Sequence, residues 1–147
     1  MNPIHILLVE DNEGDILLTK EALNQVKLIN TISVTKDGKE AISYMEKIAP
    51  YVNSSIPDII LLDINLPKMN GHEVLKYLKA NNNFKHIPII MFTTSSAERD
   101  ILESYKNYAN CYITKPVEID DFLNVIKTIE NFWMSIVQLP RTNNITK

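Results

Sequence analysis

The apolar run Ile59–Leu62 leads directly into Asp63, and the turn-forming residues Pro67 and Gly71 follow shortly afterwards. A continuous apolar run of this length, bounded by turn residues, predicts a β-strand that is buried on both faces. Such a strand needs helices packed against both sides of its sheet. In sheets of this kind, ligand sites form at the edge where the strands end, and we expect Asp63 at that edge.

Strand-like and helix-like segments alternate along the whole chain. Strands are predicted at 4–9, 31–35, 58–62, 87–92 and 111–114, and a helical pattern follows each of them. This alternation predicts a parallel sheet with right-handed crossovers and helices on both faces. We therefore expect an α/β fold, a flavodoxin-like doubly wound sheet of five parallel strands. The expected strand order is 2-1-3-4-5, because segment 31–35 is the least apolar of the five and suits an edge.

Composition limits the classes of function that the chain can have. The chain has 147 residues, a net charge of -3 and one cysteine, Cys111. The mild charge does not indicate direct DNA binding, and no apolar run is long enough to span a membrane. A lone cysteine fits a reducing compartment, and the N-terminus lacks the basic region of a secretory signal. We expect a cytoplasmic protein.

Polar side chains follow four of the five predicted strands. Glu10 and Asp11 follow the first strand, Asp63 the third, Thr93 the fourth and Lys115 the fifth. Parallel strands bring these ends to one edge, so three carboxylates, a hydroxyl and an ammonium group converge there. Two like charges about 4 Å apart repel by on the order of 4 kcal/mol at an effective dielectric of 20, so positive charge is needed. Lys115 supplies one charge, and Mg²⁺, which prefers carboxylate, phosphate and water oxygens, would supply the rest.

This set of groups suits phosphoryl transfer, in which catalysis is mostly positioning and electrostatic stabilisation. Asp63 would be the nucleophile, a known role of carboxylates. Asp11 and Asp63 would hold Mg²⁺, while Lys115 and Thr93 would each bind another phosphoryl oxygen. Taken singly, each residue has an ordinary explanation, because an acid pair after a strand usually starts a helix and Lys-Pro is usually a turn. The functional interpretation depends on the complete set.

Several sequence motifs together resemble the receiver domains of two-component response regulators. The resemblance covers about residues 4 to 130. It implies a protein of phosphorelay signal transduction that receives a phosphoryl group from a sensor histidine kinase. It also implies a signalling protein rather than an enzyme, one that catalyses only its own phosphorylation and dephosphorylation. The motifs are Leu8-Val9-Glu10-Asp11-Asn12, Asp37-Gly38-x-x-Ala41, Leu62-Asp63-x-x-Leu66-Pro67-x-x-x-Gly71, Thr93-Thr94-Ser95 and Tyr112-x-x-Lys115-Pro116.

The resemblance also implies roles for the acidic residues and their neighbours. Asp63 is the expected phospho-acceptor, Asp11 a direct Mg²⁺ ligand, and Glu10 an indirect one. Asn65 is expected to offer its backbone carbonyl to the metal. Glu10 departs from the family pattern, since many receivers have the shorter aspartate there.

The remaining motif residues are expected to act as a switch. Phosphorylation would draw Thr93 toward the phosphate, move the 93–96 loop and turn Tyr112 inward. The surface made by the fourth helix, fifth strand and fifth helix would then change its affinity for partners. Two local features are also expected: a cis bond before Pro116, implied by the family, and a capping box from Ser95 to Glu98.

The last helix is predicted over Val117–Leu139, and its apolar residues recur three or four positions apart, as in a coiled-coil seam. A helix of this length would span roughly 30 Å or more and outreach the sheet. We therefore expect Phe132, Trp133 and Ile136 at an interface and predict a homodimer through this helix. The seam residues are Ile119, Phe122, Ile126, Ile129, Trp133 and Ile136.

The end of the chain bears on domain organisation. Fewer than twenty residues follow Phe132, so we expect a stand-alone receiver domain over 1–140 and a polar tail over 141–147. The Phe132-Trp133 and Leu139-Pro140 pairs also resemble the ending of small receivers that are paired with phytochrome-type histidine kinases.

Three other functions remain open on the sequence. A flavodoxin-like electron carrier has the same fold, but Glu10 and Asp11 would repel the phosphate of its flavin. A phosphatase with an aspartyl-phosphate intermediate would need an acid two residues after Asp63, where this chain has Asn65. A phosphate-independent adaptor built on the receiver fold would not need the complete set of polar groups.

Overall fold

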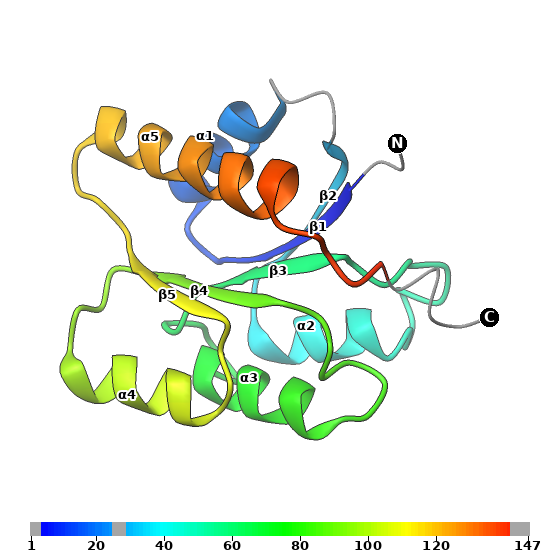
Figure 1. Ribbon diagram of the computed structural model, residues 1–147. Coiled ribbons are helices and arrows are strands. Elements are labelled where there is room, and N and C mark those ends of the chain that lie inside the picture. The colour runs from blue at the N-terminus through cyan, green and yellow to red at the C-terminus, as the bar shows by residue number, and fades with distance from the viewer. Residues whose placement is uncertain (1–3, 25–28, 142–147) are drawn as a thin grey trace.

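The computed structural model describes residues 4–24 and 29–141, which form a parallel sheet between two layers of helices (Figure 1). The strand order is β2-β1-β3-β4-β5, so the predicted fold class and strand order are confirmed. The strands are β1 (Ile4–Val9), β2 (Ile29–Thr35), β3 (Ile59–Leu62), β4 (Ile89–Thr93) and β5 (Cys111–Thr114). The helices are α1 (Glu13–Asn24), α2 (Gly38–Met45), α3 (Gly71–Ala80), α4 (Glu98–Lys106) and α5 (Ile119–Ile129).

The two faces of the sheet carry separate hydrophobic cores. Helices α1 and α5 cover one face, and α2, α3 and α4 cover the other (Figure 1). Strand β3 contributes Ile59 and Leu61 to the first core and Ile60 and Leu62 to the second, and all four are fully buried. This two-sided burial explains why the run shows no polar alternation. Each such side chain contributes roughly 1.5–3 kcal/mol of hydrophobic stabilisation.

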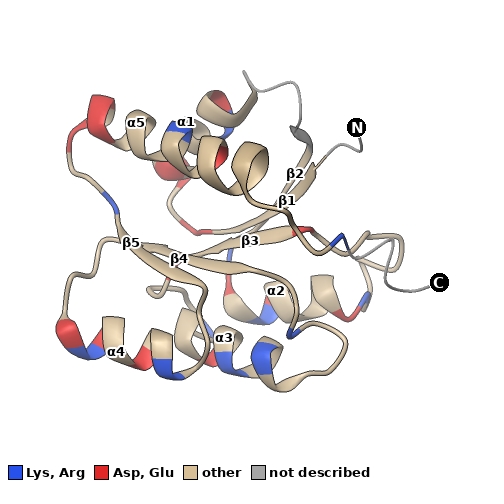
Figure 2. Cartoon of the chain, viewed as in Figure 1, with Lys and Arg blue, Asp and Glu red and all other residues tan. Residues whose placement is uncertain are grey.

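Strand pairing brings the predicted site residues to one edge. The last residues of β1 and β3, Val9 and Leu62, are partners in the ladder. Asp63, the residue after β3, donates its backbone N–H to the carbonyl of Val9 at 3.1 Å. Across β4, the backbone N–H of Lys115 donates to the carbonyl of Thr93 at 2.6 Å. The first turns of α4 and α5, both acidic, also lie along this edge (Figure 2).

The end of the last helix differs from the prediction. Helix α5 ends at Ile129 and continues as a π-helix, η1 (Glu130–Ile136), so the prediction of one α-helix over Val117–Leu139 was wrong. A π-helix closes its hydrogen bonds five residues apart instead of four, which rotates the side chains that follow. As a result Met134, outside the predicted seam, is buried, whereas Ile136 of the seam is 61% exposed.

Two local expectations were also wrong. Helix α4 has Ala97 at its N-cap without a side-chain cap, so Ser95 and Glu98 form no capping box. The hydroxyl of Ser95 donates instead to Asp100 Oδ2 at 2.6 Å. The bond before Pro116 is not cis, because the cis peptide bond within residues 4–24 and 29–141 is Ala49–Pro50.

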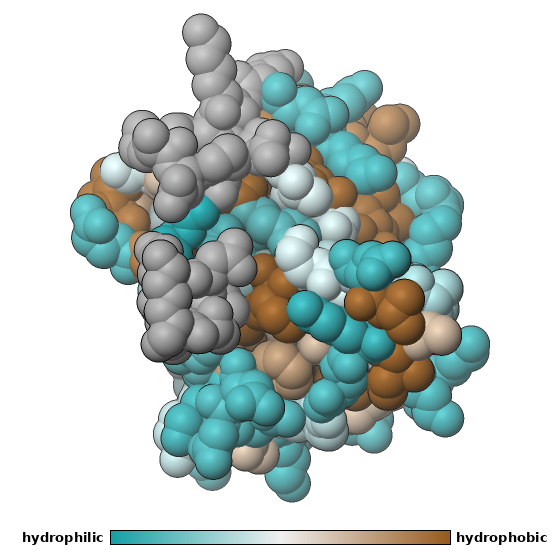
Figure 3. Space-filling view, turned by 90° about the vertical axis from the view of Figure 1, so that its right-hand side faces the viewer, coloured by the Kyte–Doolittle hydropathy of each residue, from teal (hydrophilic) through white to brown (hydrophobic). Residues whose placement is uncertain are grey.

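The opposite edge of the sheet, where the strands begin, anchors the chain after η1. Arg141, the first residue of the predicted tail, donates from Nε to Asp58 Oδ1 at 3.1 Å. The rest of that tail, 142–147, lies outside the described residues, and a domain boundary at residue 140 stays a prediction. On the visible part of this side, hydrophobic patches are broken up by hydrophilic residues (Figure 3). Within the described ranges, no helix has the length and hydrophobicity required to cross a bilayer.

Candidate functional site

Lys115 follows the outer strand β5, and its side chain extends along the carboxyl edge of the sheet so that its ammonium group contacts three carboxylates. Nζ donates to Asp63 Oδ2 at 3.1 Å, to Asp15 Oδ2 at 2.9 Å and to Oε1 of Glu10. The side chain of Lys115 is only 3% exposed, and those of Glu10 and Asp63 are 3% and 7% exposed. The structure therefore brings together the three buried charges that the strand ends predicted.

Asp15 is a member of this cluster that the sequence did not reveal. It belongs to the first turn of α1, where an acid is already explained by the helix dipole. Asn12 fixes the start of that helix, because its Oδ1 accepts the backbone N–H of Asp15 at 2.9 Å. This cap sets the position of Asp15 beside Lys115. The position of Asp15, in the first helical turn after the Glu10-Asp11 pair, was the available signal for a place in the cluster. An acid in a first helical turn is common, so this signal did not stand out.

Burial and crowding shift the ionisation of the cluster. Burial raises the pKa of Glu10 to about 7, and the charge of Asp63 adds to this effect against the hydrogen bond from Lys115. Burial alone would lower the pKa of Lys115. The hydrogen bonds to Glu10 and Asp15, with the charges of Asp63 and Glu10, outweigh burial and raise it. Lys115 is thus a permanent cation surrounded by more negative charge than it can neutralise.

The donor set next to Lys115 fits a hard divalent cation. Glu10, Asp11 and Asp63 each offer a carboxylate oxygen, and these atoms all lie within 4.8 Å of one another. Glu10 and Asp63 are buried, whereas Asp11 is exposed, so the group opens to solvent on one side. Carboxylate oxygens in this number are suited to Mg²⁺ or a similar ion. Asn65 follows Asp63 on the exposed side, and its backbone N–H donates to Asp63 Oδ1 at 3.3 Å.

The predicted switch residues lie beside the cluster. Thr93 is fully buried at the end of β4, and its Oγ1 accepts the backbone N–H of Ser95 at 3.4 Å. Tyr112 packs against the core beneath α2, α3 and α4, and its hydroxyl donates to the carbonyl of Ser95 at 2.8 Å. In this structure Tyr112 already lies inward, in the sense that it packs against this core, and its movement on phosphorylation stays a prediction.

Steric crowding explains why the motif that contains Asp63 has glycine at position 71. A Cβ atom at Gly71 would lie 2.1 Å from the carbonyl oxygen of Asp63 and 2.7 Å from Cα of Ile64. Both contacts are too short for any side chain, so α3 can begin this close to Asp63 only with glycine. The N–H of Gly71 donates to the carbonyl of Ile64 at 2.8 Å and closes the loop.

The predicted interface residues differ in exposure. Phe132 and Ile136 are 50% and 61% exposed, whereas Trp133 is half-buried and packs against the core beneath α1 and α5. An open apolar cavity of about 330 Å³ lies beside them. It is lined by Ile113, Val125, Thr128, Ile129, Phe132 and Trp133.

Known proteins resemble this chain over nearly its whole length. The profile of the response regulator receiver domain matches residues 6–127. The response regulator Rcp1 of Synechocystis sp. is 40% identical over 138 residues, which are 94% of this chain and 94% of that protein. The alignment therefore covers almost the full length of Rcp1.

Solved structures agree with the sequence comparison. The phosphorylated cyanobacterial phytochrome response regulator RcpA has a TM-score of 0.92 and 43% identity, with 94% of this chain and 99% of that chain covered. The Mn²⁺-bound form of Rcp1 has a TM-score of 0.90 and 40% identity over the same shares. One similar protein is thus known with its phosphoryl group and another with a divalent metal.

Proposed function

Because the chain belongs to the response regulator receiver family, we propose that Asp63 is the aspartate on which it accepts a phosphoryl group. Receiver domains are phosphorylated on an aspartate in two-component signalling, and that is the function of this chain as a family member. The observation that carries the assignment is the contact between Asp63 Oδ2 and the buried Lys115 ammonium at 3.1 Å. Among the aspartates of residues 4–24 and 29–141, only Asp63 both contacts Lys115 and belongs to the three-carboxylate group. Of the other described aspartates, Asp15 contacts Lys115 but lies outside that group, and Asp11 belongs to the group but forms no ion pair with Lys115.

The chemistry follows from the position of each side chain. A carboxylate oxygen of Asp63 attacks the phosphorus atom, and the bond from phosphorus to the donor group breaks. Lys115 binds a phosphoryl oxygen, which disperses the charge that collects there. The buried hydroxyl of Thr93 donates to another oxygen. The same groups serve when water attacks the acyl phosphate, so we assign to this chain catalysis of its own phosphorylation and dephosphorylation and no other reaction.

Receivers bind a divalent metal, and we assign Mg²⁺ to this chain. Asp11 and Asp63 would hold it directly, Asn65 through its backbone carbonyl, and Glu10 indirectly. When bound, the ion neutralises charge on the phosphoryl group and on the surrounding carboxylates. The raised pKa of Glu10 supports this assignment, because it arises first from burial and then from the negative charge of Asp63, and a bound cation would offset both.

We assign a sensor histidine kinase as the partner, of the phytochrome type, because the similar solved structure of RcpA is that of a phytochrome response regulator. We also infer a homodimer through Phe132, Trp133 and Ile136, supported by the exposure of Phe132 and Ile136 beside an apolar cavity. The free thiol of Cys111 supports a cytoplasmic location. Sedimentation of the protein as a monomer at micromolar concentration, with and without a phosphoryl mimic, would contradict the dimer.

One experiment tests the role of Asp63. The protein is incubated with Mg²⁺ and acetyl phosphate, and its intact mass is measured. We expect a phosphoryl adduct in the wild type and none in Asp63→Asn. The matched control is Asp120→Asn, an exposed acid in the first turn of α5, which should keep the adduct. A wild type without an adduct, under conditions that label another receiver, would favour the phosphate-independent adaptor.

A further inference from the structure

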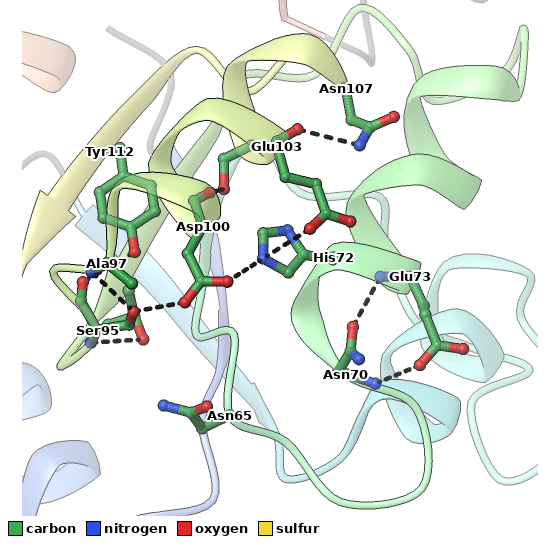
Figure 4. A network of polar contacts seen from close by, with 12 residues as sticks. Asn65, Asn70, His72, Glu73, Ser95, Ala97, Asp100, Glu103, Asn107 and Tyr112 are labelled. Atoms are coloured by element: carbon green, nitrogen blue, oxygen red, sulfur yellow. Dashed lines mark hydrogen bonds and ion pairs between the residues drawn. The ribbon is translucent and has the colours of Figure 1, made fainter.

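A chain of hydrogen bonds links the switch loop to two helices (Figure 4). The hydroxyl of Ser95, two residues after Thr93, donates to Oδ2 of Asp100 in the first turn of α4 at 2.6 Å. The other oxygen of that carboxylate, Oδ1, accepts from Nε2 of His72 in the first turn of α3 at 3.0 Å. Asp100 therefore connects a loop at the phosphoryl site to the start of α3, the helix that packs beside α4.

This connection is shielded from solvent and carries charge. The side chains of His72 and Asp100 are 11% and 21% exposed. The hydrogen bond from Ser95, followed by that from His72, lowers the pKa of Asp100, so the carboxylate stays ionised at neutral pH. Hydrogen bonds to an ionised, partly buried acceptor are roughly twice as strong as neutral ones. The hydroxyl of Ser95 is therefore held more firmly than the hydroxyl of a solvated loop serine would be.

Ser95 is also bonded through its backbone to both switch residues. Its carbonyl accepts the hydroxyl of Tyr112 at 2.8 Å, and its N–H donates to Oγ1 of Thr93 at 3.4 Å. A displacement of Ser95 would therefore break the contact that holds Tyr112 inward and would disturb Thr93. The contact to Asp100 and the contact to Tyr112 are both made by Ser95, so a change in one can reach the other through a single residue.

The geometry favours a positioning role for His72 over metal binding. His72, Asp100 and Glu103 lie close enough to offer three ligand atoms to an ion. However, Nδ1 of His72 is buried and has no hydrogen-bond partner within the described part of the chain. A metal-bound imidazole almost always donates its second N–H to an acceptor. A carboxylate only accepts, so Nε2 of His72 carries the hydrogen that it shares with Asp100.

We propose that His72 and Asp100 are positioning residues for the phosphoryl site, which fix Ser95 so that Tyr112 stays inward and Thr93 stays in place. Neither residue touches the reacting atoms. By linkage, contacts that favour the form competent to bind a phosphoryl group raise the affinity for that group. This inference rests on the proposed role of Asp63 and adds a control element on α3 and α4.

The test uses beryllofluoride, a stable phosphoryl mimic, titrated with Mg²⁺ present and followed by calorimetry. We expect Asp100→Ala to weaken binding about fivefold to tenfold, because two hydrogen bonds that order the loop are lost. His72→Leu should weaken binding about threefold to fivefold, and His72→Gln, which keeps a donor, should recover most of it. Asp100→Asn keeps the shape of the side chain and serves if Asp100→Ala unfolds. The matched control is Glu98→Ala, an exposed acid in the same first turn of α4, which should bind within about twofold of the wild type.

A double-mutant cycle separates positioning from general destabilisation. In a Tyr112→Phe background, which lacks the hydroxyl that meets Ser95, Asp100→Ala should weaken binding by less than about twofold. Equal losses in both backgrounds would overturn the inference, as would unchanged or tighter binding in Asp100→Ala alone. If the wild type fails to bind and forms no adduct on Asp63, both the inference and the proposed function fail. If the wild type binds and Asp63→Asn does not, only the Asp100 results decide the inference.

Discussion

The ammonium group of Lys115 lies 3.1 Å from the carboxylate of Asp63, although β4 separates their strands in the sheet. The contact is possible because parallel strands end at one edge of the sheet and the side chain of Lys115 is long enough to pass the end of β4. Asp15 and Glu10 share the same ammonium group. One buried cation therefore holds together the ends of β1, β3 and β5 and the start of α1.

Removal of that cation should destabilise the protein in a way that metal can partly reverse. Lys115→Met leaves buried carboxylates without a partner, and breaking such a pair costs about 3–5 kcal/mol. We expect a loss of about 3 kcal/mol in the free energy of unfolding without metal, and a smaller loss with saturating Mg²⁺, as measured by urea denaturation. The control is Lys36→Met. Its ion pair with Glu13 is exposed and screened by solvent, so the change should leave the free energy of unfolding close to that of the wild type.

Mg²⁺ binding should depend on pH through Glu10. The pKa of Glu10 is raised to about 7, so below that pH the metal must displace a proton from the folded protein. Apparent Mg²⁺ affinity should rise by up to about tenfold per pH unit as the pH approaches 7, and level off above it. Calorimetric titrations at several pH values measure this trend. Glu10→Gln cannot ionise and should give a flat profile in the same range, so equal slopes for both proteins would refute the prediction.

The same group fixes the sign of a stability trend in the metal-free protein. A folded-state pKa above the ordinary value of 4.5 means that folded Glu10 holds a proton which unfolded Glu10 has released. Relative to Glu10→Gln, metal-free wild type should lose stability as the pH rises from about 4.5 through 7.

Gly71 should tolerate no side chain. In Gly71→Ala the new Cβ would lie 2.1 Å from the carbonyl oxygen of Asp63, so the backbone that carries Asp63 must move. We expect a loss of about 2–3 kcal/mol in stability and at least a tenfold slower phosphorylation by acetyl phosphate. Gly14→Ala is the control, since its nearest contact is Asn12 Oδ1 at 3.3 Å and its site is exposed. Its stability should stay within about 1 kcal/mol of the wild type.

Charge on the exposed residues of η1 should dissociate the proposed dimer without unfolding the chain. Phe132→Glu and Ile136→Glu alter side chains that are at least half exposed, so their melting temperatures should stay close to that of the wild type. Sedimentation velocity should show them as monomers. Leu17→Glu changes a residue on α1 that is 59% exposed and should leave the dimer intact. Dissociation by Leu17→Glu alone would move the interface to α1.

Sequence reasoning succeeded where one rule governs many residues. The uninterrupted apolar run of β3 fixed a doubly covered sheet, and parallel strands then placed Glu10, Asp63, Thr93 and Lys115 at one edge. It failed where a residue had two explanations. Asp15 fits a helix start as well as an ion pair, and the hydroxyl of Ser95 had the spacing of a cap but found a stronger acceptor in Asp100.

The π-helix was hidden for a different reason. Apolar residues keep a spacing of three and four from Ile126 to Ile136, so the pattern itself shows no change at Glu130. Tertiary contacts distinguish η1. Met134 packs in the core beneath α1 and α5, and Arg141, after η1, forms an ion pair with Asp58. Contacts of this range do not appear in local periodicity.

The π-helix also matters to anyone who grafts this receiver onto another protein. A fusion that continues α5 as a straight α-helix past Ile129 would turn Phe132 and Ile136 away from the directions they have here. Designed chimeras should therefore keep residues 119–137 as one piece, or join the partner before Glu130 and accept the loss of that surface.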